Sequence, residues 1–275
     1  MPLRRPLIRT IREFTDGTYS DSGNWQYLLH PLYVKNPQHY IRSFLLLQDD
    51  LEKLFEYIEP ADQNKDTISL KIQELLVRTC IEVEANFTGI LLENTYSQTK
   101  NMNMKTDYCL IDYSHKLSSY KIKLPIWLGD QHTRCPFEKW KNKKDEKWYA
   151  LDWYQAYNKS KHERYTYFSK ATFEVLIDAF CGLVVILTSQ FLDESYSPST
   201  KSLSISGNYS YDYDPSFETA IGNYFRVQYP DDWSNEELYD FKWHEIENVD
   251  NVFEKIDYDS IKMKAISNDE IKLNP

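Results

Sequence analysis

The chain has 275 residues, of which 41% are hydrophobic and 15% aromatic, so it can bury a sizeable core and is not a disordered chain. Its formal net charge of −10 excludes nucleic-acid binding over the whole surface, and any contact with a polyanion would need a local basic patch. It contains 7 glycines and neither of the glycine-rich phosphate motifs, GxGxxG and GxxxxGK(S/T).

The cysteines and histidines give no sign of a metal site. Cys80, Cys109, Cys135 and Cys181 form no CxxC pair, which is typical of a reducing compartment and argues against a zinc cluster. The 6 histidines show no compact metal-binding spacing, so we expect neither a metal nor another cofactor. No continuous apolar segment marks the N-terminus as a signal peptide, and we expect a cytoplasmic protein.

Residues 1–37 show no clear hydrophobic period, and we expect an N-terminal extension of loops and short turns packed on the core. This segment contains the first of two basic clusters, formed by Arg4, Arg5, Arg9 and Arg12. The second cluster consists of five lysines between Lys139 and Lys147. Each cluster is either a solvated surface, which is the commoner case, or a patch that binds a polyanion.

Helical periodicity starts at residue 38. Apolar side chains recur at three- and four-residue steps over 38–59, and Pro60 ends this first predicted helix. The same period predicts a second helix over 67–95, in which Thr67 or Asp66 can cap the first turn.

Residues 100–145 lose the helical period and are rich in aromatic and β-branched residues, which predicts one or two short strands near 108–112 and 119–124. We interpret this segment as a small β element inserted between helices. A third helix is predicted over 148–164 and a fourth over 169–193. They form either one bent helix or two helices separated by a short break.

The fourth predicted helix includes the most apolar run of the chain, FEVLIDAFCGLVVILTSQFL, residues 173–192. Glu174 and Asp178 interrupt this run. Its uninterrupted part, residues 179–187, is far shorter than the roughly 20 residues that cross a bilayer. We therefore expect a buried core helix and no contact with a membrane.

After residue 193 the chain becomes polar and aromatic, and we expect an irregular C-terminal extension, 194–275, packed on the outside of the helices. Residues 195–215 are predicted to form a long loop or, alternatively, a hairpin. Ser234 and Glu237 have the spacing of a capping box. The tail from residue 248 is acidic and is predicted to be peripheral.

The main indication of function is the stretch WYQAYNKSKHERYTYF, residues 153–168. On a helix, Leu151, Gln155, Asn158 and His162 share one face, and Lys161 lies beside them. Metal-independent RNA cleavage needs a base, a cation at the phosphorane and an acid. An imidazole moves protons, an ammonium neutralises phosphate and an amide orients either group. His162, Lys161 and Asn158 are therefore candidate catalytic residues. A second copy of the chain could supply the missing acid.

The second predicted helix offers partners for this polar group. Glu82 or Glu84 could accept a hydrogen bond from His162 or Lys161, and both are included as candidate catalytic residues. The candidate substrate-binding residues are Arg164, Arg78 and Tyr157. The alternative is a structural network that locks the two helices together, with Arg78 and Glu82 forming an ordinary surface ion pair at a four-residue spacing.

The string YNKSKHER, preceded by WYQA, resembles a bacterial pattern, W-x-A-Y-N-x-x-K-H-x-R, of uncharacterised HEPN-like proteins, with one residue more between Trp153 and Ala156 than the pattern has. The upstream RTCIEVEANF, residues 78–87, fits its partner helix, and the resemblance covers about residues 38–193. HEPN domains are small helical bundles that often dimerise, and many are RNA-cleaving toxins or effectors of bacterial defence. Active HEPN ribonucleases carry an arginine shortly before the histidine, where this chain has Gln155, Ala156 and Tyr157 and offers Lys161 as a replacement cation.

These elements predict a mainly α fold, a helical bundle over 38–193 with a small β insertion at about 100–145, and the resemblance implies that this bundle is HEPN-like. The resemblance implies an RNA-acting protein, a metal-independent ribonuclease in phage defence or a toxin system. The alternative is a catalytically inactive HEPN-like interaction or dimerisation module with a structural Asn-Lys-His network. The expected partners are RNA, a second copy of the chain as a homodimer, or another protein.

Overall fold

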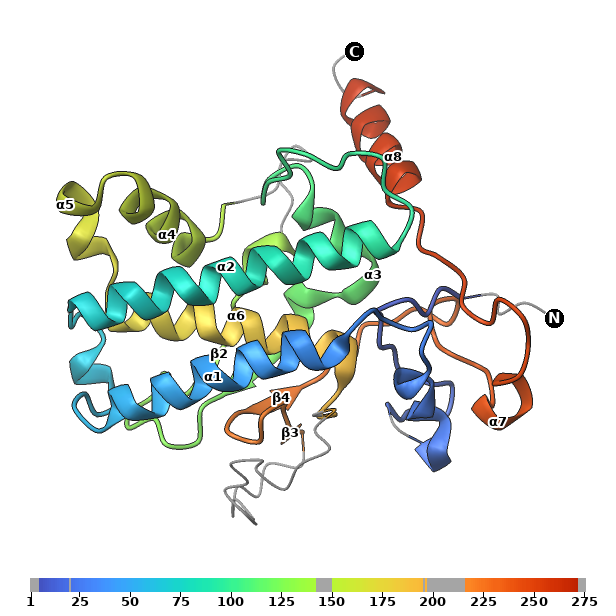
Figure 1. The fold of residues 1–275 in the computed structure, drawn as a ribbon, viewed down its shortest axis with the longest axis horizontal. Helices are drawn as coiled ribbons and strands as arrows, with labels where there is room; N and C mark the ends of the chain where they lie inside the picture. Colours follow the sequence, from blue (N-terminus) through green and yellow to red (C-terminus); the bar gives the residue numbers. More distant parts are fainter. Residues whose placement is uncertain (1–4, 20, 142–149, 195, 197–215, 272–275) are drawn as a thin grey trace.

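The structure is a computed structural model that describes residues 5–19, 21–141, 150–194, 196 and 216–271. The fold is mainly α, and its bundle consists of α1 (Pro37–Phe55), α2 (Leu70–Glu93), α4 (Asp152–His162) and α6 (Phe173–Phe191) (Figure 1). The shorter helices are α3 (Asp112–His115), α5 (Arg164–Tyr167), α7 (Trp243–Ile246) and α8 (Tyr258–Ile271). The start predicted for the third helix, three of the five clustered lysines and nearly all of the predicted loop or hairpin at 195–215 lie outside the described residues.

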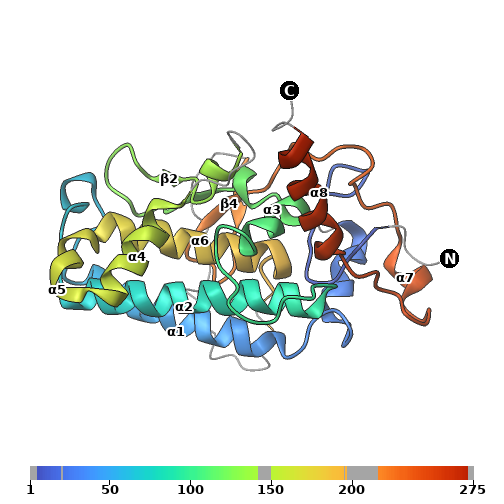
Figure 2. The same cartoon turned by 90° about the horizontal axis from the view of Figure 1, so that it is seen from above.

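The long helices lie alongside one another. α1, α2 and α6 run side by side, and α4 and α5 lie at the end of the bundle opposite α7 and α8 (Figures 1 and 2). α2 contacts α1, α4 and α6. α2 is therefore the helix that packs against each of the other three long helices of the bundle.

The first two predicted helices are confirmed, with shifted ends. α1 has Pro37 in its first turn and buries one face, formed by Ile41, Phe44, Leu47, Gln48 and Leu51. α2 starts later than predicted because its cap is Ser69 rather than Thr67 or Asp66. The Ser69 hydroxyl accepts a hydrogen bond from the backbone amide of Ile72 (3.1 Å).

α6 is the core helix of the fold. By length and composition α6 could cross a membrane, since its most apolar 18-residue stretch has a mean hydropathy of 1.7. However, 83% of that stretch is buried inside the protein. It contacts α2, α4 and β1, and every residue from 179 to 191 is buried. The expectation of a buried core helix is confirmed.

The predicted third and fourth helices are two separate helices. α4 ends at His162, and α5 and a 3-10 turn at Phe168–Lys170 lie between it and α6. The side chain of Thr172 accepts a hydrogen bond from the amide of Val175 (3.4 Å) and so caps α6. The break leaves α4 and α5 as a distinct segment at one end of the bundle (Figure 1).

One small antiparallel sheet joins two distant parts of the chain. Its strands, in the spatial order β2–β1–β4–β3, are Thr133–Arg134, Lys121–Lys123, Arg226–Gln228 and Glu218–Thr219. Ile122 of β1 pairs in register with Arg134 of β2 and with Val227 of β4. The predicted β insertion therefore completes its sheet only with strands from the C-terminal extension.

Of the two strands predicted in the insertion, the one near 119–124 is confirmed by β1 and the one near 108–112 is wrong. Tyr108–Ile111 form a 3-10 turn that continues into α3. All four residues of that turn are buried. A short continuous apolar run does not distinguish a buried strand from a buried helical turn.

The N-terminal extension packs on the core, as predicted, but its arginines do not form a surface cluster. Arg9 is 0% exposed and Arg12 is 8% exposed. Arg5 forms an ion pair with Asp240 (2.6 Å), and Arg4 lies outside the described residues. Neither a solvated surface nor a polyanion patch describes this cluster, because two of its guanidinium groups are inside the protein.

The C-terminal extension contributes to the core as well as to the surface. Tyr239 and Tyr258 are fully buried, and a β-bridge joins Tyr239 to Phe14 of the N-terminal extension. The prediction of a peripheral tail is therefore wrong at Tyr258. Glu237 accepts a hydrogen bond from the Ser234 amide (2.9 Å), as in a capping box, but a turn follows it in place of a helix.

Candidate functional site

Trp153 fixes the start of α4 on the bundle. Its side chain is buried, and its Nε1 donates a hydrogen bond to the carbonyl oxygen of Pro136 (3.0 Å). The indole lies against Gly182 of α6, where an added Cβ would come within 3.1 Å of the ring. The absence of a side chain at Gly182 therefore leaves space for the indole, and α4 packs closely against α6.

Tyr154 connects α4 to α2. Its hydroxyl donates a hydrogen bond to Oε1 of Glu84 (2.6 Å). Burial, together with the Glu84 carboxylate, raises the pKa of Tyr154, so the phenol stays protonated and remains the donor. A hydrogen bond to a charged acceptor contributes more than one between neutral groups. The donor predicted for Glu84 was His162 or Lys161, and the structure gives that role to Tyr154.

Lys161 bonds to a residue of its own helix. Its Nζ donates a hydrogen bond to the hydroxyl of Tyr157 (2.9 Å) and lies 5.0 Å from the centre of that ring, as their four-residue spacing allows. This hydrogen bond, together with the charge of Glu84, raises the pKa of Lys161. We call the group formed by Glu84, Tyr154, Tyr157 and Lys161 the α2–α4 cluster.

The predicted polar stripe runs from the core to the solvent. Leu151 is buried, Gln155 and Asn158 are half-buried, and His162 is exposed at the last residue of α4. Among the described residues, the side chains of Asn158 and His162 have no hydrogen-bond partner. The structure therefore leaves both outside the α2–α4 cluster, with the imidazole free to meet a ligand.

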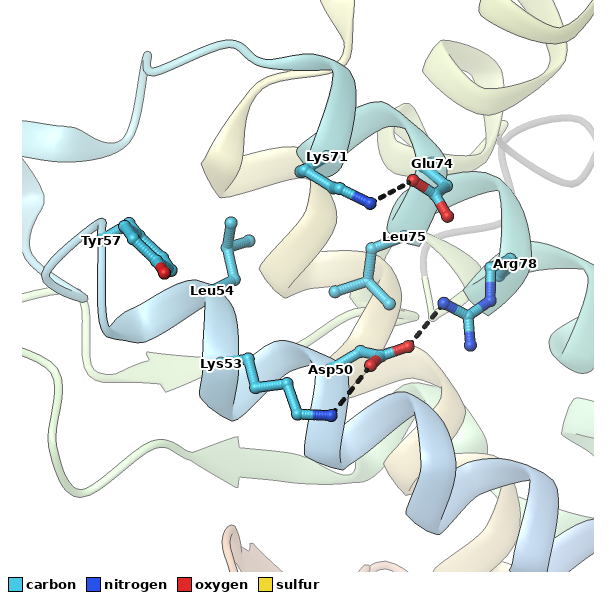
Figure 3. Close-up of a pocket in the computed structure, with 8 residues that line it drawn as sticks. All are labelled: Asp50, Lys53, Leu54, Tyr57, Lys71, Glu74, Leu75 and Arg78. Atoms are coloured by element: carbon cyan, nitrogen blue, oxygen red, sulfur yellow. Dashed lines mark hydrogen bonds and ion pairs between the residues drawn. The ribbon is translucent and has the colours of Figure 1, made fainter.

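Arg78 and Glu82 lie apart from this cluster. Arg78 forms an ion pair with Asp50 of α1 (2.6 Å) and not with Glu82, its predicted partner. It lines a hollow of about 240 Å³ between α1 and α2 (Figure 3). The backbone carbonyl of Glu82 accepts a hydrogen bond from Asn86. Arg78 thus faces α1, whereas the α2–α4 cluster lies on the side of α2 that meets α4.

Residues 152–170, which we call the α4–α5 arm, present a basic surface. Arg164 donates a hydrogen bond to Gln73 (2.9 Å) and so ties the arm to the start of α2. Tyr165 is 99% exposed, and the Lys159 ammonium lies 5.7 Å from the centre of the Tyr167 ring. From 159 to 170 the charged residues besides His162 are four bases and one acid: Lys159, Lys161, Arg164, Lys170 and Glu163. Positive charge is therefore concentrated here on an otherwise acidic chain.

In comparisons with protein-family models, with curated proteins and with solved structures, no match to this chain was found. The function therefore has to follow from the chemistry of the site itself. Among the described residues, no group of three or more histidine, cysteine, aspartate or glutamate side chains could hold a metal ion.

The exposed side of the arm combines groups that suit RNA. Ammonium and guanidinium groups contact phosphates, an exposed aromatic ring stacks on a base, and an imidazole can transfer a proton. Sequence reasoning identified Lys161, His162 and Arg164 but missed Tyr154. The available signal was its spacing of three residues to Tyr157 and seven to Lys161, which puts all three on one face of α4.

Proposed function

We propose that this chain is an RNA-binding protein with a HEPN-like helical bundle, and that its RNA contact surface is the α4–α5 arm. The observation that carries the proposal is the composition of the arm's exposed side. Lys159, Lys161, Arg164 and Lys170 are exposed on the same arm as Tyr165, which is 99% exposed, although the chain as a whole carries a net charge of −10. Local basic charge with an unpaired aromatic ring is the pattern expected of a single-stranded RNA surface.

The α2–α4 cluster supports this role from beneath. Tyr154 ties the arm to α2 through Glu84, and Tyr157 holds the ammonium of Lys161 at the surface. A cation held in place loses less conformational freedom when it meets a phosphate. The arm therefore offers partly preorganised phosphate contacts, together with the exposed ring of Tyr165.

In the catalytic form of this proposal His162 transfers the proton. One imidazole can act as the base on the 2′-OH or as the acid on the leaving oxygen, and the other role needs a second group. The resemblance to HEPN proteins implies a homodimer, in which the second His162 would supply it. This is the form that suits a metal-independent ribonuclease in phage defence or a toxin system.

A second candidate is a catalytically inactive HEPN-like module that binds RNA or a protein partner. Two observations favour it over catalysis. Lys161 is hydrogen-bonded to Tyr157, and among the described residues no carboxylate forms a hydrogen bond or ion pair with His162. A catalytic histidine is normally oriented by such a group.

The binding experiment uses a fluorescein-labelled single-stranded RNA and fluorescence anisotropy. Tyr165→Ala removes a stacking platform that contributes about 1–3 kcal/mol per base, so the Kd should rise at least about fivefold. Lys159→Gln combined with Lys170→Gln should weaken binding further. The matched control is Lys53→Gln combined with Lys71→Gln, which removes two exposed lysines from the α1–α2 hollow (Figure 3). Equal loss in the control and the arm variants would contradict the proposal.

A cleavage experiment separates the two candidates. Purified protein is incubated with total RNA and with tRNA in the presence of EDTA, beside the His162→Ala variant. Cleavage by the wild type alone would support the catalytic form and assign the proton transfer to His162. Binding without cleavage, or equal cleavage by both proteins, would leave the inactive module as the function.

A further inference from the structure

A second surface of the protein also concentrates positive charge. A hollow of about 670 Å³ lies where the amino end of α1 meets the carboxyl half of α2. These parts of the two helices are at the end of the bundle opposite the α4–α5 arm (Figure 1). Three basic residues, Lys35, His39 and Arg42, line it and are exposed. Among the described lining residues the one acid is Glu93. We call this site the α1 hollow.

The start of α1 adds its own positive end to the hollow. α1 has 19 residues, and its N-cap residue, Asn36, has a left-handed backbone (φ 53°) and forms no side-chain cap hydrogen bond. Pro37 has no amide hydrogen, and the His39 amide donates to the carbonyl oxygen of Asn36 (3.0 Å), which leaves the backbone amide of Gln38 without a cap. Such a group, together with the helix dipole, favours an anion at this place.

Arg9 lies directly beneath the wall of the hollow. Its side chain is fully buried, and its guanidinium carbon lies 4.5 Å from the centre of the Tyr40 ring. Its Nη1 is 3.4 Å from Oε1 of Glu93, and a Cβ on Gly89 would collide with that same nitrogen. Tyr40, Gly89 and Glu93 all line the hollow, so the guanidinium end of Arg9 is directed at its wall.

The guanidinium is incompletely paired. Nε donates a hydrogen bond to Oε1 of Gln190 (2.8 Å), but Nη2 is buried and has no partner among the described residues. Glu93 is shared, because its second oxygen accepts from the backbone amide of Lys35 (3.2 Å). Buried charges are normally paired and hydrogen-bonded. The positive charge of Arg9 is therefore only partly compensated, and it lies next to the hollow without lining it.

We propose that the α1 hollow binds a phosphomonoester. The backbone amide of Gln38 and the side chains of Lys35, His39 and Arg42 hold the phosphate, and Arg9 supplies positive charge from below. The hollow is large enough for a nucleotide. Glu93 is compatible with an anion because its carboxylate is turned to Arg9 and to the Lys35 amide. This proposal is independent of RNA binding by the arm, because the two surfaces lie at different ends of the bundle.

The test is isothermal titration calorimetry of the full chain with inorganic phosphate and with AMP. The variant is Lys35→Gln combined with Arg42→Gln, because both side chains are exposed and their loss should leave the fold intact. We expect its affinity for AMP to fall at least about tenfold. The control, Lys53→Gln combined with Lys71→Gln, should bind as the wild type does. No binding at millimolar phosphate, or equal affinity of the variant and the wild type, would overturn the proposal.

Two further titrations identify the source of the phosphate. Adenosine should bind more weakly than AMP by at least about tenfold, and equal binding of the two would overturn the proposal. An oligoribonucleotide with a 5′-phosphate is compared with the same strand ending in a 5′-hydroxyl. Tighter binding of the phosphorylated strand, abolished in the α1-hollow variant, would identify an RNA end as the ligand. Binding of AMP without this discrimination would identify a free nucleotide. Arm variants such as Tyr165→Ala should leave the AMP affinity unchanged.

Discussion

The two ends of α2 handle positive charge in opposite ways. At the carboxyl end, the guanidinium of Arg9 is fully buried against Glu93 and Gln190. Toward the amino end, Lys161 and Arg164 of the arm are exposed and donate to neutral groups. A buried cation cannot be removed without leaving its partners unsatisfied, whereas exposed cations contribute little to stability. The comparison therefore separates residues that maintain the fold from residues that are free to bind.

The largest effect is expected at Arg9. Arg9→Met keeps an unbranched side chain but removes the charge opposite the partly buried Glu93, and it leaves Gln190 without its donor. We expect the free energy of unfolding to fall by about 3 kcal/mol, measured by urea denaturation. The control is Arg42→Met on the exposed side of α1, which should change it by less than about 0.5 kcal/mol. Equal losses in the two variants would remove the contrast between buried and exposed charge.

His115 lies in the same buried region as Arg9. Its Nε2 donates a hydrogen bond to the backbone carbonyl of Arg9 (2.5 Å), and its Nδ1 lies 2.9 Å from the hydroxyl of Ser114. Burial, with the charges of Arg12 and Arg9, lowers the pKa of His115 to about 3. The folded state then binds fewer protons than the unfolded state, in which the pKa is about 6.5. The contribution of His115 to the stability of the folded state is therefore fully present above about pH 6.5, and it is lost as the pH falls toward 3.

A pH comparison tests this linkage. From about pH 7 to about pH 5, the free energy of unfolding of the wild type should fall by up to about 2 kcal/mol more than that of His115→Gln. Burial raises the pKa of Asp178 to about 6, so its contribution has the opposite sign, but it is the same in both proteins. Urea denaturation at the two pH values provides the measurement. Parallel losses would show that His115 does not titrate on unfolding.

A smaller effect is expected where the arm meets α2. Tyr154→Phe leaves the half-buried carboxylate of Glu84 without its donor, and the free energy of unfolding should fall by about 1–2 kcal/mol. Tyr165→Phe is the matched control, because that side chain is 99% exposed and should show no change. A loss in the control as large as that in Tyr154→Phe would mean that the hydrogen bond to Glu84 does not anchor the arm.

The smallest effect on stability is expected at His162. The side chain is exposed and, among the described residues, has no hydrogen-bond partner. His162→Ala should therefore change the free energy of unfolding by less than about 0.5 kcal/mol, as measured in a thermal melt. A loss of about 2 kcal/mol or more, on the order of a broken buried network, would mean that His162 maintains the fold and is not free to bind.

α1 and α2 were predictable because each buries a regularly spaced apolar face, and α6 because its apolar run is long. The contacts between them were not. The partner of Glu84 depends on how α4 is rotated against α2, and a one-dimensional pattern does not determine whether Tyr154 or Lys161 reaches it. The positions of Asn158 and His162 on one face were predictable from their spacing, but their exposure depends on where the arm leaves the bundle.

Burial of Arg9 could not be predicted from its neighbours in sequence. Four arginines within the first twelve residues indicate a surface cluster when only composition is considered. The space for the guanidinium comes from Gly89 on α2 and its main acceptor from Gln190 on α6, both far along the chain. The sheet could not be predicted from neighbouring residues either, because β1 pairs with β4 from the C-terminal extension.

The most direct test of the arm as an RNA surface is the salt dependence of RNA binding. The affinity for a single-stranded RNA is measured by anisotropy at several salt concentrations, for the wild type, for Lys159→Gln with Lys170→Gln, and for Lys53→Gln with Lys71→Gln. Removing one lysine that pairs with a phosphate should reduce the slope of log K against log salt by about 0.7. We expect a smaller slope in the arm variant and an unchanged slope in the control. An arm variant with the slope and affinity of the wild type would contradict the account.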